Sequence, residues 1–353
     1  MIQRENLKTD FYSSCKLCPR NCGVGRTAWD SSTPVSERKA GFCMEPSEIR
    51  LAVACLHFGE EPLLTVNGGS GTIFLTGCNL RCAFCQNYQI SQKGMGKNVS
   101  ADEFAEICLK LQSIGAENIN IVTGSHHVPA IAKGLEKAKL QGLSLPVCWN
   151  SSGYDSVESL KMLDGLVSIY LPDLKTLSSE LSKSLCSAAD YPSVAKKAIE
   201  YMISKNPLKI VEVADSSNPS SKKEKIESGV IVRHLFLPGK FFETADVLEW
   251  LHQNVDGKAI ISLMSQYTPV PFKESDEENA RRKKALSVIE NRLVNESEDN
   301  DLRDLIEAYD FDYLFYQDLF QDTEWLPDFE KIQPFSYKLA KPVWHWSKGF
   351  VEN

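Results

Sequence analysis

The chain has 353 residues, of which 42% are hydrophobic and 24% are charged, and its formal net charge is -8. These values are typical of a globular protein and exclude a disordered or fibrous chain, and the negative balance argues against a broad nucleic-acid surface, so we expect no nucleic-acid partner. No stretch approaches the roughly 20 apolar residues of a membrane span, and the first ten residues lack the apolar core of a signal peptide. We therefore expect a cytoplasmic protein with no membrane association.

The first feature along the chain is a group of four cysteines, among eleven in total. In a compartment that keeps thiols reduced, clustered cysteines indicate metal binding or catalysis rather than disulfides. A zinc ion and a second four-iron cluster fit the ligand count equally well; the zinc would only stabilise the segment, whereas the cluster could relay electrons. We predict that residues 1–65 are a Cys-rich, metal-binding N-terminal extension whose candidate ligands are Cys15, Cys18, Cys22 and Cys43.

Residues 66–272 alternate short apolar runs with longer amphipathic stretches, which predicts an α/β fold with a parallel sheet of βα units. A helix should begin after Ser100, a favourable N-cap, with Glu103 at the capping-box position and Gly115 as its terminator. The polar run 214–228 predicts an exposed loop or the tip of a hairpin. Strands are expected at 72–77, 118–123, 146–150, 167–175, 209–213, 229–239 and 259–269.

Residues 273–353 are expected to form a C-terminal helix, an edge strand and a lid-like tail. A charged helix around 276–293 leads into an acidic patch at 295–304. The run 311–317 should add a strand that covers the edge of the sheet. Because aromatic residues in such tails more often pack than recognise a ligand, we interpret the tryptophans as core or lid residues. They are Trp325, Trp344 and Trp346.

The stretch "GTIFLTGCNLRCAFCQN" places Cys78, Cys82 and Cys85 on one short loop directly after the first predicted strand. Three thiolates are one ligand short of a closed tetrahedral site, whereas a four-iron cluster held by three cysteines leaves one iron free to bind something else. The loop leaves the carboxyl end of its strand, where α/β barrels and open sheets place their active sites. A zinc loop with a fourth ligand from elsewhere and three buried thiols are the alternatives.

This loop resembles the signature of the radical S-adenosylmethionine (AdoMet) superfamily, including an aromatic residue, Phe84, before the last cysteine. In that superfamily the free iron chelates the amino and carboxylate groups of AdoMet. An electron from the cluster then splits the sulfonium and yields a 5′-deoxyadenosyl radical, which abstracts hydrogen from the substrate. The resemblance implies an enzyme with a 4Fe-4S cluster on Cys78, Cys82 and Cys85, AdoMet as a bound cofactor, and an electron donor such as flavodoxin or ferredoxin.

Further segments resemble an uncharacterised branch related to pyruvate formate-lyase activating enzyme, and together they cover most of the chain. They are "CKLCPRNCGVGR", "VTGSHHVPAI", "NSSGYDSVESLKMLDGLVSIYLPDLK", "VIVRHLFLPG" and "ISLMSQYTP". The implied fold is a partial (β/α)6, TIM-like barrel. Such a barrel stays open on one side, so that a substrate as large as a protein loop can reach the radical.

The resemblance also assigns site residues. Asp173 and Lys175 match the D-x-K element that lies near bound AdoMet in the activating enzymes, and Arg233 lies on a strand that faces it there. We expect Lys175 near the AdoMet carboxylate, because a zwitterion in a partly dry site needs partners of both signs. A surface ion pair is the alternative interpretation of any D-x-K element taken alone.

The chain departs from the superfamily after its second predicted strand, where a G-G-E-like turn usually binds the AdoMet amino group. It has Thr123, Ser125, His126 and His127 there instead, so we expect the contact from Thr123, Ser125 or backbone carbonyls. His126 and His127 are candidate catalytic proton donors, although a histidine is more often structural. Asn150 stands where the activating enzymes have an acidic turn, which indicates that a cation site has been lost.

Three functions are compatible with these features. The chain could be a glycyl-radical enzyme activase that takes hydrogen from a glycine of a partner protein. It could instead be a radical AdoMet enzyme that modifies a small molecule, a peptide or a protein side chain, because fold does not fix substrate. The third is a non-catalytic metal-binding scaffold, against which the intact cysteine loop argues.

Overall fold

The structure is a computed structural model of the chain, and it describes residues 11–30, 32–218, 220–272, 277–317, 319 and 326–351. Trp325 lies outside these residues. Within them, no helix combines the length and the apolar character that a bilayer span requires.

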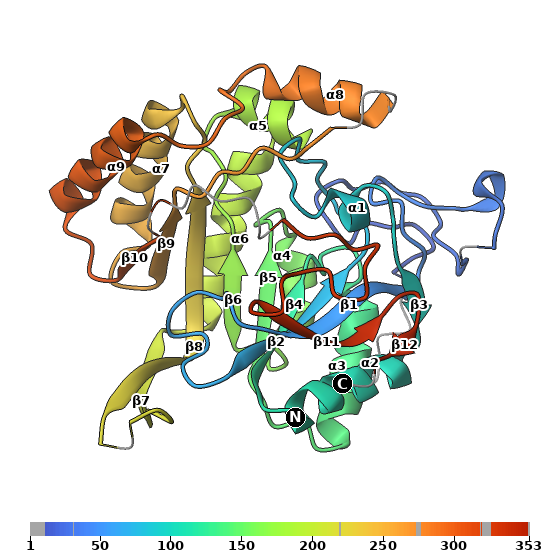
Figure 1. Cartoon of the computed structure of the whole chain (residues 1–353). Helices are drawn as coiled ribbons and strands as arrows, with labels where there is room; N and C mark the ends of the chain where they lie inside the picture. The colour runs from blue at the N-terminus through green and yellow to red at the C-terminus, as the bar shows by residue number, and fades with distance from the viewer. Residues whose placement is uncertain are drawn as a thin grey trace.

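A single curved sheet organises the described residues (Figure 1). Its central strands are parallel, in the order β2, β4, β5, β6, β8, β9 and β10, and β1 and β11 extend it in antiparallel fashion beyond β2. Because β10 and β12 lie at opposite ends of this order, the sheet does not close on itself, and the predicted partial barrel is confirmed. The strands are β1 (Ile49–His57), β2 (Gly69–Leu75), β3 (Lys97–Val99), β4 (Ala116–Val122), β5 (Val147–Ser151), β6 (Ile169–Pro172), β7 (Lys209–Ala214), β8 (Lys222–Leu235), β9 (Ile260–Met264), β10 (Leu314–Gln317), β11 (Ala340–His345) and β12 (Gly349–Phe350).

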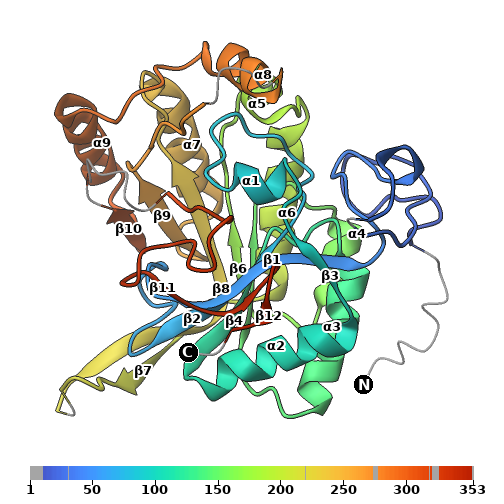
Figure 2. The ribbon, with the colours of Figure 1, turned by 45° about the vertical axis from the view of Figure 1, so that its right-hand side comes forward.

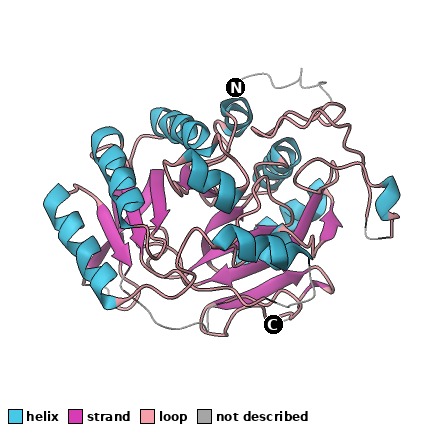
Figure 3. Ribbon diagram, turned by 90° about the horizontal axis from the view of Figure 1, so that it is seen from above, coloured by secondary structure: helices cyan, strands magenta, loops and turns pink. Residues whose placement is uncertain are grey.

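Helices cover the convex side of the sheet, as the view from above shows (Figure 3). Residues alternate along each strand: Ile121 and Trp149 join the large core under the helices, whereas Cys148 belongs to a separate cluster on the opposite, concave face. The helices are α1 (Tyr88–Ser91), α2 (Ala101–Ser113), α3 (Val128–Leu140), α4 (Val157–Leu160), α5 (Ser179–Cys186), α6 (Tyr191–Lys205), α7 (Phe241–Asn254), α8 (Glu277–Leu286) and α9 (Glu296–Tyr309), with short 3-10 turns η1 (Val35–Glu37) and η2 (Lys161–Leu163).

Helix α2 begins as predicted, because the Ser100 hydroxyl accepts a hydrogen bond from the Glu103 N–H at 3.1 Å. The Glu103 carboxylate does not complete the expected box; it accepts a bond from the indole N–H of Trp344, at 3.0 Å. Trp344 is fully buried, so it is a core residue, and it fixes β11 against α2. Glu103 therefore holds the C-terminal tail against α2 instead of completing the capping box.

Three unpredicted strands, β1, β11 and β12, come from segments assigned to the extensions. β1 lies within residues 1–65, and β11 lies in the C-terminal tail; the two pair with each other. The strand predicted at 311–317 is confirmed as β10, which adds to β9 at the far edge. The hairpin expected around 214–228 is present, because β7 and β8 pair and project from the body of the molecule (Figure 1), but its tip is shorter than predicted, since β8 already begins at Lys222.

The acidic patch at 295–304 is part of helix α9, which we did not predict. Asn295 caps this helix with a complete capping box, in which the side chains of Asn295 and Glu298 each bond the other's backbone. Three acidic residues occupy the first turn, where the helix dipole favours negative charge. The acidic segment, whose composition resembles a solvated loop, is therefore a helix with a favourable N-terminal cap.

Candidate active site

The loop that carries Cys78, Cys82 and Cys85 lies at the carboxyl end of β2, and backbone contacts hold it in place. The N–H groups of Arg81 and Ala83 donate to the carbonyls of Cys186 and Leu185, at the end of α5. The Gln92 side chain donates to the carbonyl of Cys82 at 2.9 Å. The loop is thus fixed against a helix that lies more than a hundred residues further along the chain.

The three thiols are half-buried and electrostatically linked. Burial is the largest influence and raises the pKa of Cys78 and Cys85; the neighbouring Cys82 raises both further, and the Lys175 ammonium lowers them. The pKa of Cys82 is lowered, mainly by its contact with the Cys186 thiol and also by Lys175. Since only thiolates bind metal, a cation beside the three sulfurs favours their ligand form.

The donor set of the loop is compatible with a four-iron cluster. Across the described residues, no three His, Cys, Asp or Glu side chains are arranged to hold one metal ion. In a four-iron cluster each cysteine binds its own iron, so the sulfurs need not converge on one point. The backbone N–H of Leu80 donates to the Cys78 sulfur at 3.3 Å, which stabilises a thiolate there.

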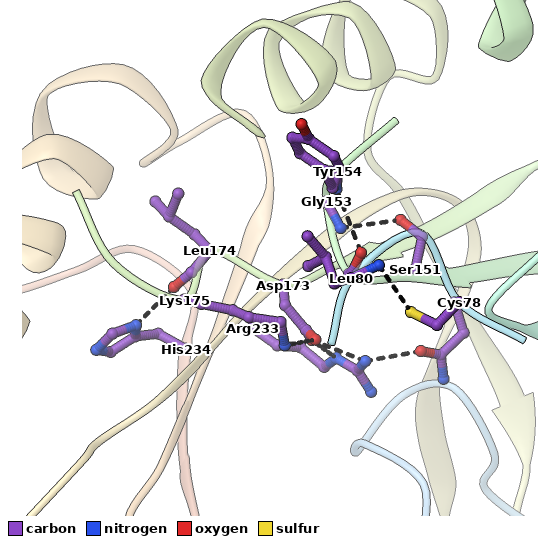
Figure 4. A network of polar contacts seen from close by, with 12 residues as sticks. Cys78, Leu80, Ser151, Gly153, Tyr154, Asp173, Leu174, Lys175, Arg233 and His234 are labelled. Atoms are coloured by element: carbon purple, nitrogen blue, oxygen red, sulfur yellow. Dashed lines mark hydrogen bonds and ion pairs between the residues drawn. The ribbon is translucent and has the colours of Figure 1, made fainter. Parts of the chain in front are cut away.

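Beside this loop, Asp173, Lys175 and Arg233 form one polar network (Figure 4), which Asn150 joins through Arg233. The Asp173 carboxylate accepts from Lys175 Nζ at 2.6 Å and from Arg233 Nε at 3.0 Å. Arg233 also donates through Nη2 to the Asn150 amide oxygen at 2.7 Å. The structure therefore brings together four residues that the sequence placed on three different strands or strand ends.

Charge pairing dominates this network. Burial alone would lower the pKa of Lys175, yet the Asp173 carboxylate holds it well above its usual value. Burial would raise the pKa of Asp173, and Arg233 and Lys175 together hold it below the usual range. Lys175 Nζ also lies 5.9 Å from the centre of the Phe84 ring, so it lies between the network and the cysteine loop.

The residues after β4 lie in two different surroundings. Thr123 adopts a left-handed backbone, with φ of 61°, and its N–H donates to the Asn150 carbonyl, so it borders the network. Ser125, His126 and His127 are buried. The His126 Nε2–H donates to the Thr76 carbonyl at 2.8 Å.

Neither imidazole is placed to titrate near neutral pH. Burial, followed by the Arg26 charge, lowers the pKa of His126 to about 3, and burial lowers the pKa of His127 well below its usual value. Arg26 donates to the His126 carbonyl, and the buried Glu45 lies 3.7 Å from His127 Nε2. Both rings therefore pack against the N-terminal segment rather than the Asp173 network, and their catalytic assignment stays a prediction.

The N-terminal cysteines lie in a segment at the rim of the barrel, drawn in blue in Figure 2. Cys15, Cys18 and Cys43 are buried and Cys22 is exposed. The thiols influence one another: the charges of the other three each raise the pKa of Cys18, after burial. Arg26 Nη1 donates to the Cys15 sulfur at 3.6 Å, which supplies a counter-charge for thiolates.

Sequence reasoning missed three charged residues at the site. Arg20, which lies between Cys18 and Cys22, donates to the carbonyl of Asn79 at 2.7 Å. Glu61 bonds to Arg233 Nη1 at 3.2 Å, and Glu60 lies beside it. Glu60 and Glu61 stand in no recognisable motif, and Arg20 lies within the N-terminal cysteine motif but is not one of its candidate ligands; the roles of all three arise from segments that meet only in the folded chain.

The site agrees with what comparisons of the chain show. Residues 72–211 match the family model described as the Radical SAM superfamily. An uncharacterised protein of Methanocaldococcus jannaschii is 28% identical over 314 residues, which cover 87% of this chain and 78% of that protein.

Several solved structures are similar at low identity. Streptococcus suis SuiB bound to S-adenosylmethionine matches with a TM-score of 0.45 and 13% identity, over 68% of this chain and 48% of SuiB. Coproporphyrinogen III oxidase from Escherichia coli matches with a TM-score of 0.41 and 10% identity, over 65% of this chain and 50% of that enzyme. A domain of pyruvate-formate lyase-activating enzyme from Bacteroides vulgatus matches with a TM-score of 0.35 and 11% identity, over 54% of this chain and 92% of that domain. The chain thus spans about half the length of the first two proteins.

The region that matches the family model begins in β2 and ends in β7. It contains the three cysteines of the loop, Asp173 and Lys175. Residues 72–211 are therefore a radical SAM domain.

Proposed function

We propose that Cys78, Cys82 and Cys85 hold a 4Fe-4S cluster, that AdoMet binds between this loop and Lys175, and that the substrate lies below it inside the barrel. The observation that carries the proposal is the position of Lys175, which acts on all three thiols and is paired with Asp173. When bound, the cluster supplies the electron that converts AdoMet to a 5′-deoxyadenosyl radical, the species that takes hydrogen from the substrate.

The chain's own residues bind and orient AdoMet in this proposal. Lys175 Nζ stays protonated, because Asp173 raises its pKa, and so offers a permanent positive partner for the AdoMet carboxylate. The Asp173 carboxylate, ionised because of Arg233 and Lys175, accepts from the amino group. Arg233 keeps Asp173 in place, and Thr123 and Asn150 border the same space with backbone and side-chain oxygens. In this proposal the Asp173 carboxylate, held by Arg233 on β8, takes the place of the G-G-E-like turn that the chain lacks.

Packing at the open side supports a small substrate rather than a protein loop. The chain leaves β10 at one edge of the sheet and returns as β11 at the other edge, and the red coil before β11 is visible in Figure 2. Phe329 and Phe335 of this tail pack on Phe74, with ring centres 5.7 and 5.3 Å away. Phe74 lies in register, through Val122, with Asn150 of the network, so the tail fills part of the concave face. A glycyl-radical activase would have to displace it.

We extend the proposal to the N-terminal cysteines and the reductant. Arg26 beside Cys15 and the mutual influence of the four thiols support a metal centre at Cys15, Cys18, Cys22 and Cys43, either a second 4Fe-4S cluster or zinc. Arg20 links this segment to the loop of Cys78, which supports a cluster that passes electrons from a flavodoxin or ferredoxin.

The test combines metal analysis with an activity assay. Anaerobically purified wild type and a triple variant with Cys78→Ala, Cys82→Ala and Cys85→Ala are compared by iron, sulfide and zinc content, Mössbauer spectroscopy and 5′-deoxyadenosine formation with dithionite. If both sites hold clusters, we expect about eight irons in wild type and about four in the variant. If the N-terminal site holds zinc, we expect about four irons in wild type and none in the variant, with the zinc retained. Fully reconstituted wild type that forms no 5′-deoxyadenosine would leave only the metal-binding scaffold.

A further inference from the structure

The segment between β1 and β2 enters the barrel from the amino ends of the parallel strands. Leu64 is 1% exposed and packs in one cluster with concave-face residues of β5, β6, β8 and β9. The backbone N–H of Ile226 on β8 donates to the carbonyl of Leu63. This segment therefore closes the floor of the barrel, and the two glutamates that precede it lie in the interior.

The two glutamates have different hydrogen-bond partners. The Glu60 carboxylate lies 3.2 Å from His57 Nδ1 and accepts from the Thr72 hydroxyl at 3.2 Å. Glu61 Oε1 pairs with Arg233 Nη1, but its Oε2 is buried and finds no hydrogen-bond partner among the described residues. The side chains of Glu60 and Glu61 are only 8% and 10% exposed. A buried carboxylate oxygen without a donor costs free energy, so it marks a position where a donor is expected.

Asn120 is a second unsatisfied group in the same interior. It lies on β4 between Ile119 and Ile121, which face the helices, so its side chain faces the concave side. Asn120 is 0% exposed, and neither its amide nitrogen nor its amide oxygen has a partner in the described part of the chain. The residue two positions earlier, Asn118, is equally buried but donates to the Leu64 carbonyl and accepts from the Ser70 hydroxyl.

Register places Asn120 beside the glutamates. Its partner on β2 is Thr72, which bonds Glu60. Its partner on β5 is Cys148, whose pKa burial raises and the charges of Glu60 and Glu61 raise further. Asn120 therefore lies between two strand positions that the glutamates contact or influence.

The sign of the charge that this interior would accept follows from Arg233. Its Nε, Nη1 and Nη2 groups already donate to Asp173, Glu61 and Asn150. An anionic group would therefore meet two carboxylates, and the Arg233 guanidinium is already paired with Asp173 and Glu61. A neutral or cationic group with N–H or O–H donors would instead satisfy Glu61 Oε2 and the amide oxygen of Asn120.

We propose that Asn120, Glu60 and Glu61 form the substrate-binding site of this enzyme, and that its ligand is a small neutral or cationic molecule with N–H or O–H donors. The site rests on the proposed function, because Arg233 joins it to the Asp173–Lys175 pair and so places the ligand beneath AdoMet. Glu61 and Asn120 are binding residues whose unpartnered atoms the ligand completes.

The first measurement compares stability in the absence of ligand. Full-length Asn120→Leu and Asn118→Leu variants are reconstituted and unfolded thermally beside wild type. N120L removes polar atoms that form no hydrogen bond, so we expect it to unfold at or above the wild-type temperature. N118L loses two hydrogen bonds and should unfold at a lower temperature. An N120L protein that is destabilised as much as N118L would assign Asn120 a purely structural role and overturn the proposal.

The second measurement uses three probes of equal length and different charge. Binding of n-butylamine, butyramide and butyrate to the holoenzyme is followed by saturation-transfer difference NMR. We expect the amine and the amide to bind and butyrate not to bind. N120L should weaken the binding of both about tenfold or more. Glu61→Gln, which removes a negative charge, should abolish the preference for the amine over butyrate. Equal binding of butyrate, no binding of any probe, or unchanged binding in N120L would each refute the site.

Formation of 5′-deoxyadenosine by wild type is assayed in parallel. Wild type that cleaves AdoMet but binds no probe refutes the substrate site alone. Wild type that binds the probes but never cleaves AdoMet refutes the proposed function on which the site depends.

Discussion

The guanidinium of Arg20 donates to the backbone carbonyl of Asn79 over 2.7 Å, which joins the N-terminal cysteine segment to the residue next to Cys78. The same group donates to the Ser187 carbonyl at 2.6 Å and lies 3.8 Å from the centre of the Phe42 ring. One side chain thus contacts both cysteine-bearing segments and the end of α5.

Replacing Arg20 by Ala should loosen the loop that holds the active-site cluster. Loss of a charged donor to two carbonyls should lower the free energy of unfolding by about 2 kcal/mol and speed the loss of iron from the Cys78 site. Iron release to a chelator under anaerobic conditions measures this. The exposed Lys16→Ala in the same segment is the control, and equal iron release from both variants would show that Arg20 does not position the loop.

Replacing Cys82 by Ala should abolish AdoMet cleavage while leaving any N-terminal metal bound. Only the cluster on the loop loses a ligand, because Cys15, Cys18, Cys22 and Cys43 lie in a separate segment. Cleavage is measured as 5′-deoxyadenosine, and metal by elemental analysis. Cys108→Ala, in the core of α2, is the matched control and should cleave normally. Cleavage retained by C82A would mean that the loop does not hold the reactive cluster.

Replacing Lys175 by Ala should weaken AdoMet binding roughly tenfold to a hundredfold with the cluster intact, because it removes the only proposed cation for the AdoMet carboxylate. Equilibrium binding of AdoMet, with the cluster absorbance as an internal check, measures the effect. The exposed Lys197→Ala on α6 should bind like wild type. An unchanged affinity in K175A would disprove the role taken from the D-x-K resemblance.

The buried histidines should make the fold sensitive to acid. The pKa of His126 is about 3 in the folded chain and about 6.5 when unfolded, so the unfolded state binds more protons between these values. The contribution of His126 to the free energy of unfolding is therefore complete above pH 6.5 and falls as the pH decreases toward 3. At pH 5 the loss is about 2 kcal/mol.

Comparison with His126→Gln, which keeps a donor for the Thr76 carbonyl, isolates this effect, because His127 and Glu45 titrate in both proteins. Glu45 acts in the opposite sense, since burial raises its pKa to about 7. Denaturant unfolding at pH 5 and 7.5 gives the two free energies. The pH dependence should be weaker in H126Q, and an equal dependence would show that His126 is not the group responsible.

The sequence predicted those features that depend on residues close together in the chain. The cysteine spacing and the strand before it identified the loop, and Ser100 identified the start of α2. The Asp173–Arg233 pair came from resemblance, because the two residues are far apart in the sequence. Helix α9 was missed because its acidic first turn has the composition of a solvated loop, although Asn295 and Glu298 carried a capping signal.

Glu60 and Glu61 could not be predicted, because nothing in "GEEPLL" distinguishes a surface loop from one that enters a barrel. Their burial depends on Leu64 meeting four strands that come later in the chain. β1 and β11 were missed for a related reason: antiparallel partners at opposite ends of the chain leave no local signal of their pairing. Tertiary contacts, rather than propensity, decide these positions.

The pairing of His57 with Ala340 has a consequence for how the protein is made. During synthesis, β1 leaves the ribosome long before β11 exists, so the edge of the sheet carries unpaired backbone groups until residues 340–345 have been translated. Contacts of such high sequence separation also form slowly. This edge of the sheet therefore forms late, and iron delivered before it forms would meet a nascent barrel whose concave face is still open to water and oxygen.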